Sequence, residues 1–358
     1  MNRRHFIVLT ATGLPAIGQE AAAADLAVRL ETIRAKHGLP ALTAGLVTTD
    51  GLKHSATVGM RKAGGKTPAT NADLWHYGSN TKAMTAMLLG TFVAAGKLKW
   101  DAPLTELIPD IMRGASTGAK KITLRHLLTH RSGLRANPES WGQKPRDRSK
   151  NVQDELKRDP LSEPGTTFLY SNLGYVVAGV VAEKLGGGLW EKVIHERLFK
   201  PLGMKMGFGG TGTPGREDQP WPHGDDGKPM PRNGPEVDNP PPLGPAGTCH
   251  GALAEYAKFL ADYLRGAAGK KALLPQSIYT DLATPPAGAD YALGWDTVPQ
   301  KWAGGTALTH AGSNTMNYAL TWMAPARGYA VVACCNQGGP KADAACNEAC
   351  DVLIAEQG

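Results

Sequence analysis

Two β-hairpin patterns, one near each end of the chain, restrict the fold more than any other feature of this sequence. The apolar runs Ala41–Val47 and Leu52–Val58 flank Asp50-Gly51, and Asp-Gly between such runs favours a tight hairpin turn. The β-rich runs Tyr318–Met323 and Tyr329–Cys334 form a second pair, joined by a turn that contains proline and glycine. A helical pattern lies beside each hairpin, so both ends of the chain are predicted to contribute to one antiparallel sheet.

The helical patterns complete the prediction of an α+β fold. Residues 25–37 and about Ala342–Ile354 show apolar side chains at helical spacing, and these terminal helices are expected to flank the antiparallel β-sheet. The middle of the chain, about 70–260, is predicted to form a mostly helical lobe inserted in this α/β part. The helical segments predicted there are 79–95, Leu124–Leu128, 172–185 and Leu253–Leu264.

Composition narrows the class of partner. The chain has 358 residues, 42% of them hydrophobic, 20% charged, and a formal net charge of +7. Despite this charge there is no basic stripe interleaved with aromatic residues, so no nucleic-acid partner is expected. The basic run Lys144–Lys150 contains a proline and an aspartate and is interpreted as a solvated loop. No stable membrane insertion is expected, and the pattern specifies no oligomeric state.

The first 24 residues have the pattern of an export signal. Arg3-Arg4 precedes a moderately apolar run from Phe6 to Ile17, which is too short to span a bilayer. The run ends in Ala21–Ala24 before Asp25, and small residues there suit a signal peptidase. The paired arginines resemble the twin-arginine signal of bacterial proteins that are exported folded. Residues 1–24 are therefore predicted to be a signal peptide, residues 25–358 a single folded domain, and the protein periplasmic or otherwise exported. The alternative is a disordered N-terminal tail.

The sequence allows three alternatives for the bonding state of the five cysteines. Their odd number means that at least one thiol lies outside any intramolecular disulfide. A disulfide between a C-terminal helix and the strand before it is one alternative in an oxidising compartment, and a four-thiolate metal site is another. Most of the five are predicted to be small buried hydrophobic side chains. They are Cys249, Cys334, Cys335, Cys346 and Cys350.

A Ser79-x-x-Lys82 pair carries the first sign of chemistry. At the predicted first turn of a helix, a spacing of three residues places both side chains on one face. A serine hydroxyl needs a neighbouring group to take its proton, and a lysine crowded by other side chains can serve because its pKa falls. N–H groups at the helix start suit a developing oxyanion. Taken alone, such a pair is more often a capping serine and a solvated lysine.

Two further segments supply side chains of the same kind. Tyr170-Ser171-Asn172 precedes a helical run, and a tyrosine beside a cationic lysine can act as a base because its phenolate is favoured. The Asn172 amide can both donate and accept hydrogen bonds. His310-Ala311-Gly312-Ser313 enters a predicted strand, where Gly312 would let a substrate approach the backbone. His310 could bind a substrate carboxylate or assist proton transfer. In isolation, each segment is more often an ordinary helix cap or a turn with a surface histidine.

Together these three segments, in this order and spacing, resemble the motifs of the class C β-lactamase-related serine hydrolase family. That family includes class C β-lactamases, D,D-peptidases, D-aminopeptidases and family VIII esterases. The resemblance covers about residues 25–355. Segments that frame the motifs also match, namely Ile122–Leu134, Pro201–Met204, Pro245–Gly247, Gly294-Trp295 and the strand that ends at Asn336.

The resemblance implies a role for each site residue. Ser79 would be the nucleophile, Lys82 its activating partner, and Tyr170 the general base that later protonates the leaving group. Asn172 would orient the substrate and Lys82, while the backbone N–H groups of Ser79 and Ser313 would form the oxyanion hole. His310 and Gly312 would complete the substrate-binding edge. Neither a metal nor another cofactor is implied.

One departure from the family pattern bears on the substrate. Class C β-lactamases typically carry Lys-Thr-Gly where this chain has His310-Ala311-Gly312, which removes a permanent cation and a hydroxyl. We therefore expect a serine hydrolase that cleaves carboxylic ester or amide bonds through a covalent acyl-enzyme, in the first place an esterase. The alternatives are a D,D-peptidase or β-lactamase acting on cell-wall peptides or β-lactams, and a non-catalytic ligand-binding module on the same fold.

Some surrounding residues are predicted to border the site. The segment 207–247 is rich in proline and glycine and is interpreted as a rim near the active site. His76, His130, His250 and Trp141 are candidates for lining the cleft. Of these, His130 and His250 are predicted to be structural and to bond to loop backbone.

Overall fold

The core of the fold is a six-stranded antiparallel sheet in the strand order β2-β1-β9-β8-β7-β6. This computed structural model describes residues 14–358. The two predicted hairpins lie side by side, because the first strand of one pairs with the last strand of the other, with Thr43 opposite Cys334. The predicted antiparallel sheet built from both ends of the chain is therefore confirmed. The strands are β1 (Ala41–Thr48), β2 (Gly51–Gly59), β3 (Trp75–His76), β4 (Met206–Phe208), β5 (Cys249–Gly251), β6 (Asp296–Gln300), β7 (Gly305–Ser313), β8 (Tyr318–Ala324) and β9 (Tyr329–Cys335).

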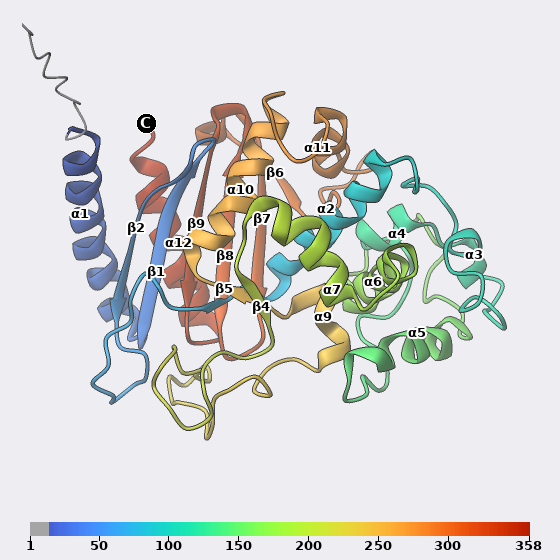
Figure 1. The fold of residues 1–358 in the computed structure, drawn as a ribbon, viewed down its shortest axis with the longest axis horizontal. Helices are drawn as coiled ribbons and strands as arrows, with labels where there is room; N and C mark the ends of the chain where they lie inside the picture. Colours follow the sequence, from blue (N-terminus) through green and yellow to red (C-terminus); the bar gives the residue numbers. More distant parts are fainter. Residues whose placement is uncertain (1–13) are drawn as a thin grey trace, which may run out of the picture.

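Helices cover both faces of this sheet. The α-helices are α1 (Leu14–His37), α2 (Thr81–Ala94), α3 (Leu104–Leu107), α4 (Leu124–Leu128), α5 (Arg148–Leu156), α6 (Asn172–Gly186), α7 (Trp190–Ile194), α8 (Lys200–Leu202), α9 (Gly244–Gly247), α10 (Leu253–Ala267), α11 (Gln276–Ala283) and α12 (Pro340–Ala355). The terminal helices α1 and α12 pack on one face, and α10 packs on the other (Figure 1). Helices α2 to α7 gather beyond the β6 edge of the sheet (Figure 1).

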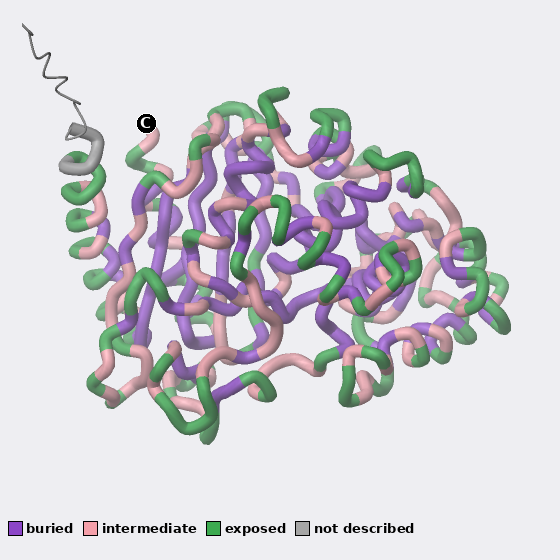
Figure 2. Tube along the Cα trace, in the orientation of Figure 1, coloured by how far each residue is buried: buried purple, intermediate pink, exposed green. Residues whose placement is uncertain are grey.

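Alternation along the strands explains how one sheet serves two cores. In β9, Val331 and Ala333 face the cluster under α1 and α12, whereas Val332 and Cys334 face the cluster that continues into the helical part. This period of two is the pattern of a sheet covered on both sides, and every residue of β9 is buried. Figure 2 shows the buried stretches running through the strands and the helices next to them.

The structure differs from the sequence prediction at the N-terminus. Helix α1 begins at Leu14 rather than near residue 25 and continues without a break through Ala21–Ala24. Alanine has the highest helix propensity, so the alanine run extends the helix rather than ending it. Residues 1–13, which include the predicted Arg3-Arg4 motif, lie outside the described residues. The export signal therefore stays a prediction.

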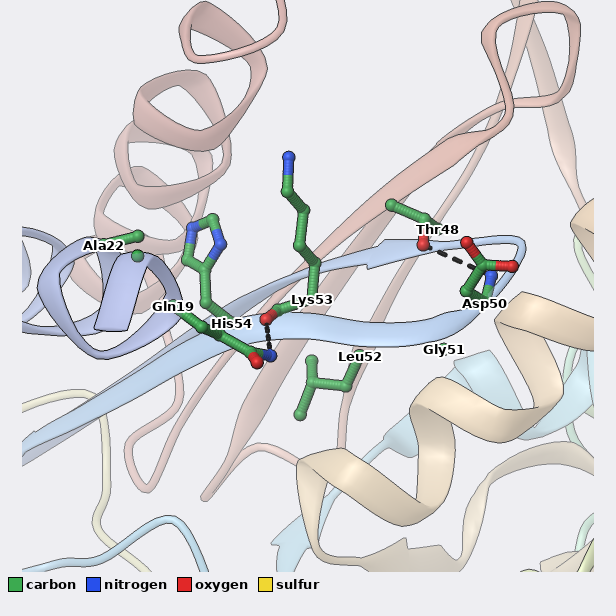
Figure 3. A pocket seen from close by; sticks show the side chains of 9 residues that line it. Gln19, Ala22, Thr48, Asp50, Gly51, Leu52, Lys53 and His54 are labelled. Atoms are coloured by element: carbon green, nitrogen blue, oxygen red, sulfur yellow. Dashed lines mark hydrogen bonds between the residues drawn. The ribbon is translucent and has the colours of Figure 1, made fainter. Parts of the chain in front are cut away.

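A cavity of about 670 Å³ lies between the start of α1 and the β1–β2 hairpin. Gly18, Gln19 and Ala22 form one wall, and the Gln19 amide donates a hydrogen bond to the carbonyl of Lys53 (Figure 3). Three of its lining residues belong to the predicted signal peptide, so cleavage after Ala24 would remove that wall. Among residues 14–358, no helix combines the length and the apolar character that crossing a membrane requires.

The structure agrees with the third alternative for the cysteines, that of small buried side chains without a disulfide. All five are buried and carry free thiols, as predicted for small hydrophobic side chains. Cys335, Cys346 and Cys350 belong to the apolar cluster under α1 and α12, while Cys249 and Cys334 belong to the other cluster. Burial raises the pKa of the Cys346 thiol well above its ordinary value, which keeps it protonated.

Candidate active site

Ser79 lies in a tight 3₁₀ turn, Gly78–Asn80, that leads directly into α2. The sequence placed Ser79 in the first α-helical turn, so this is a small correction: the α-helix itself begins at Thr81. Gly78 has φ of +48°, and a Cβ there would stand 2.5 Å from the backbone nitrogen of Ser313. A side chain at this position would collide with β7, so glycine lets the Ser79 turn approach the strand.

Lys82 is fully buried and touches three oxygen atoms from three segments of the chain. Its Nζ donates to Ser79 Oγ at 2.9 Å, to Asn172 Oδ1 at 2.8 Å and to the Ala246 carbonyl at 2.8 Å. All three oxygens are neutral, and none of the ion pairs among the described residues involves Lys82. Burial holds the pKa of Lys82 well below its ordinary value because the ammonium has lost its hydration. The predicted Ser79–Lys82 contact is present.

Tyr170 lies next to this pair, with Lys82 Nζ 4.8 Å from the centre of its ring. The expectation that the lysine favours the phenolate is wrong in direction. Burial raises the pKa of Tyr170 above its ordinary value, and a hydrogen bond with Ser79 offsets only part of that effect. A raised pKa favours the neutral phenol over the phenolate.

The end of β7 brings the third predicted segment to Ser79. Strand β6 pairs with β7 from Gln300 opposite Gly305 only as far as Asp296 opposite Thr309. In the described part of the chain, the rest of β7 has no neighbouring strand on that side, and this edge meets the Ser79 turn instead. A Cβ on Gly312 would stand 2.7 Å from the Ser79 nitrogen. The backbone nitrogens of Ser79 and Ser313, the predicted oxyanion donors, are therefore brought close together.

The side chain of His310 makes its hydrogen bonds within the protein. Its side chain is buried, Nδ1 lies 2.7 Å from the Ala311 carbonyl, and Nε2 lies 3.0 Å from the Tyr291 hydroxyl. Since a carbonyl only accepts, Nδ1 carries the proton and Nε2 accepts from Tyr291. Burial and the positive charge of Lys82 lower the pKa of His310 to about 3. His310 is thus neutral, which does not support the expected contact with a substrate carboxylate.

Asn172 and the tyrosine segment are held by the loop before them. The Ser171 hydroxyl caps α6 by accepting from Gly174 N–H at 2.9 Å. His130 Nδ1 accepts the Ser171 N–H at 3.0 Å, and the Asn172 amide donates to Asn137 Oδ1 at 3.0 Å. The prediction that His130 bonds to loop backbone is confirmed.

The other candidate lining residues have structural contacts. His250 Nδ1 donates to the Gly209 carbonyl at 2.8 Å, which confirms its predicted bond to loop backbone. Trp141 packs against the helical core. His76 bonds to Asp238 in the segment 207–247, and Asn239 in the same segment donates to the Gly247 carbonyl. The predicted rim therefore does border the Ser79 turn.

Three residues at the site were missed by the sequence analysis: Ala246, Tyr291 and Asp238. Only Ala246 had a signal in the sequence, because it lies in the Pro245–Gly247 segment that matches the family. Its contact with Lys82 is made by a backbone carbonyl, which the pattern of side chains cannot predict. Among residues 14–358, no three His, Cys, Asp or Glu side chains are grouped to hold a metal ion.

Comparisons with known proteins agree with this geometry. A sequence profile of the β-lactamase family matches residues 26–353. The chain is 28% identical over 179 residues to penicillin-binding protein 4 of Amycolatopsis lactamdurans, covering 49% of this chain and 46% of that protein. It is 31% identical over 171 residues to lovastatin esterase of Penicillium rubens, covering 40% and 41%. The chain thus spans less than half the length of these relatives.

A solved structure shows the fold over almost the whole chain. D-alanine carboxypeptidase AmpC from Burkholderia cenocepacia superposes with a TM-score of 0.74 at 19% identity, covering 93% of this chain and 100% of that one. This likeness confirms the predicted fold of an antiparallel sheet with a helical part. The profile match extends over nearly all of the same residues, with the Ser79, Tyr170 and His310 segments inside it. The protein belongs to the β-lactamase family.

Proposed function

We propose that the protein hydrolyses carboxylic esters through a covalent acyl-enzyme on Ser79. The observation that carries the choice of ester is the state of His310, which is buried, neutral and bonded to Tyr291 and Ala311. A substrate that ends in a free carboxylate would gain from a cation at this edge. A neutral ester needs none, and Ala311 offers no hydroxyl in its place.

The directions of the two pKa shifts assign the proton-transfer roles. Lys82, whose pKa is lowered, releases its proton more readily than a solvated lysine and so can accept the Ser79 proton as a neutral amine. Tyr170, whose pKa is raised, remains a neutral donor for the leaving alkoxide. This reverses the expectation in which Tyr170 is the general base.

The acylation and deacylation steps then balance. Ser79 Oγ attacks the ester carbonyl as its proton moves to Lys82, and the oxyanion lies beside the N–H groups of Ser79 and Ser313. The alkoxide leaves with a proton from Tyr170, which recovers one from Lys82. Water then attacks the acyl-Ser79 carbonyl as one of its protons moves to Lys82. The Ser79 oxygen leaves with a proton from Tyr170, which recovers one from Lys82, and the carboxylic acid is released.

The main alternative is cleavage of a D-peptide or a β-lactam. It is supported by relatives named penicillin-binding protein and β-lactamase and by the carboxypeptidase whose fold matches. A non-catalytic ligand-binding module is the third candidate. The direct bond between Lys82 and Ser79 favours chemistry over that candidate, because binding alone does not require an uncompensated buried ammonium.

Mass spectrometry of the protein mixed with p-nitrophenyl butyrate or with a penicillin separates these candidates. We expect rapid ester turnover, a transient acyl adduct on Ser79 and no stable penicilloyl adduct. A long-lived penicilloyl-Ser79 with little ester turnover would instead identify a penicillin-binding peptidase. Absence of adduct and turnover with both compounds would favour the binding module.

We also propose that the chain is exported, on the basis of the Arg3-Arg4 and Ala21–Ala24 pattern. Expression in a bacterial host followed by N-terminal sequencing of the periplasmic protein tests this. The expected first residue is Asp25, and replacing both arginines by lysine should retain the precursor in the cytoplasm. An uncleaved chain recovered only from the cytoplasm would contradict export.

A further inference from the structure

We propose that Asp238, in the proline-rich segment 207–247, is a positioning residue that holds the two oxyanion donors in register. The inference rests on the proposed acyl-transfer function, because it concerns the geometry of the same site. Asp238 does not touch the reacting atoms. Its carboxylate instead binds one side chain from the segment that carries Ser79 and one from the segment that carries Ser313.

The first contact reaches the nucleophile turn through His76. His76 Nε2 lies 2.9 and 3.0 Å from the two carboxylate oxygens of Asp238, and both side chains are only 2% exposed. Nδ1 of the same ring accepts the N–H of Gly78 at 3.1 Å. Because a backbone N–H can only donate, Nδ1 must be unprotonated and Nε2 must carry the proton. Asp238 thereby selects the tautomer that fixes the residue before Ser79.

The second contact reaches the end of β7. The Asn314 amide nitrogen donates to Asp238 Oδ1 at 2.7 Å, and Asn314 is itself 3% exposed. Asn314 Oδ1 accepts the Met316 N–H and the Asn317 amide, both at 3.2 Å, so this side chain also fixes the turn that follows. The position of Ser313, one residue earlier, is therefore set by the same carboxylate that sets Gly78.

A carboxylate is the group that this arrangement requires. Asp238 accepts from His76 with both oxygens and from Asn314 with one, and an ionised carboxylate is acceptor-only at both atoms. An asparagine at 238 would turn one acceptor into a donor that faces either the His76 N–H or the Asn314 amide. Loss of this support should displace an oxyanion donor, which weakens transition-state binding more than substrate binding.

The test compares Asp238→Asn with a matched control, Asp262→Asn. Asp262, on α10 and away from the site, is equally buried, with its side chain 2% exposed. It accepts from the Leu273 N–H and from the hydroxyl of Tyr279 on α11. We expect Asp238→Asn to lower kcat per folded molecule by about 10- to 100-fold with little change in KM. Its Kd for an alkyl boronic acid, which forms a tetrahedral adduct on serine, should rise by a similar factor. Asp262→Asn should leave kcat and the boronate Kd unchanged.

Equal kcat and boronate Kd in the two variants, or a loss that falls entirely in folded yield, would overturn the inference. If Asp238→Asn does not fold, Asn314→Ala replaces it, since that change removes a donor and leaves the carboxylate bonded to His76. The same fold-changes are expected, and wild-type values would overturn the proposal. A wild-type protein without ester turnover would contradict the proposed function alone, because the boronate affinities test the oxyanion geometry without a substrate.

Discussion

Two cations, Lys82 and Arg148, are completely buried in the helical part of the molecule, but their surroundings differ. Arg148 forms ion pairs with Glu183 and with Glu191 and donates to the Pro242 carbonyl at 2.9 Å. Among residues 14–358, the hydrogen-bond partners of Lys82 are three neutral oxygens. The two side chains hold opposite ends of one short segment, since Arg148 binds Pro242 and Lys82 binds Ala246.

The difference separates a structural charge from a reactive one. The Arg148 charge is compensated by two carboxylates, so its guanidinium serves to hold α5, α6 and α7 together. The Lys82 charge is uncompensated, and burial lowers its pKa. Such an ammonium is costly to the fold but ready to exchange a proton, which is what activation of Ser79 requires.

The largest expected effect removes the hydroxyl that Lys82 serves. Ser79→Ala should lower ester turnover by at least about 10⁴-fold, because it removes the hydroxyl that attacks the ester carbonyl. Circular dichroism should show an unchanged fold, since a single partner of Lys82 is lost. Retained turnover after Ser79→Ala would remove Ser79 from its assigned role and leave Lys82 without a reactive function.

Lys82→Met tests the reactive side of the comparison. Methionine has a similar volume but cannot accept a proton, so turnover should fall by about 10²- to 10⁴-fold. Stability to urea at neutral pH should rise, because an uncompensated buried charge is removed. As the folded-state pKa of Lys82 is lowered, this gain should shrink as the pH rises toward 10.5. A variant that is less stable than wild type at all pH values would contradict the uncompensated charge.

Arg148→Met tests the structural side. Removing the guanidinium leaves the partly buried Glu183 and Glu191 carboxylates without their cation, which should cost about 3 kcal/mol of unfolding free energy. Urea denaturation measures this, and kcat of the folded fraction should change far less than in Lys82→Met. If Arg148→Met lowered kcat as much as Lys82→Met does and left stability unchanged, the assignment of Arg148 as structural and Lys82 as reactive would be wrong.

His310→Gln gives the smallest expected effect and extends the comparison to a group buried as a neutral base. The pKa of His310 is about 3 when folded and about 6.5 when unfolded, so the unfolded chain binds the extra proton between these values. Acidification through this window therefore destabilises the wild type. Between about pH 7 and pH 4.5 the wild type should lose about 2 kcal/mol more stability than His310→Gln. Parallel stability curves for the two proteins would show that His310 is not buried neutral.

Many of the helices and strands could be predicted from the local sequence pattern. The run Leu124–Leu128 was predicted with the bounds that α4 has, and both hairpins were predicted to within one residue at each strand end. These elements have strong signals, namely turn chemistry at Asp50-Gly51 and apolar periodicity on either side. The short strand β6 was not predicted, because its five residues include Pro299 and lack a continuous apolar run.

The sequence predicted which residues form the site but not the directions of their pKa shifts. Ser79, Lys82, Tyr170 and Asn172 were identified from spacing and resemblance, and the structure brings them together. The raised pKa of Tyr170 and the neutral state of His310 depend on burial, which a linear pattern does not specify. Asp238 was missed for a related reason: its partners His76 and Asn314 are distant in the chain and meet only in the folded protein.

The contacts of the Ser79 turn also set when the site appears during folding. Lys82 binds oxygens 90 and 164 positions later in the chain, and the Asn80 amide binds the Ala319 carbonyl 239 positions later. Closing such long loops is entropically expensive and delays the contacts that depend on them. A partly folded chain therefore carries an inert serine. Acyl transfer begins only when the last of these loops has closed, near the end of folding.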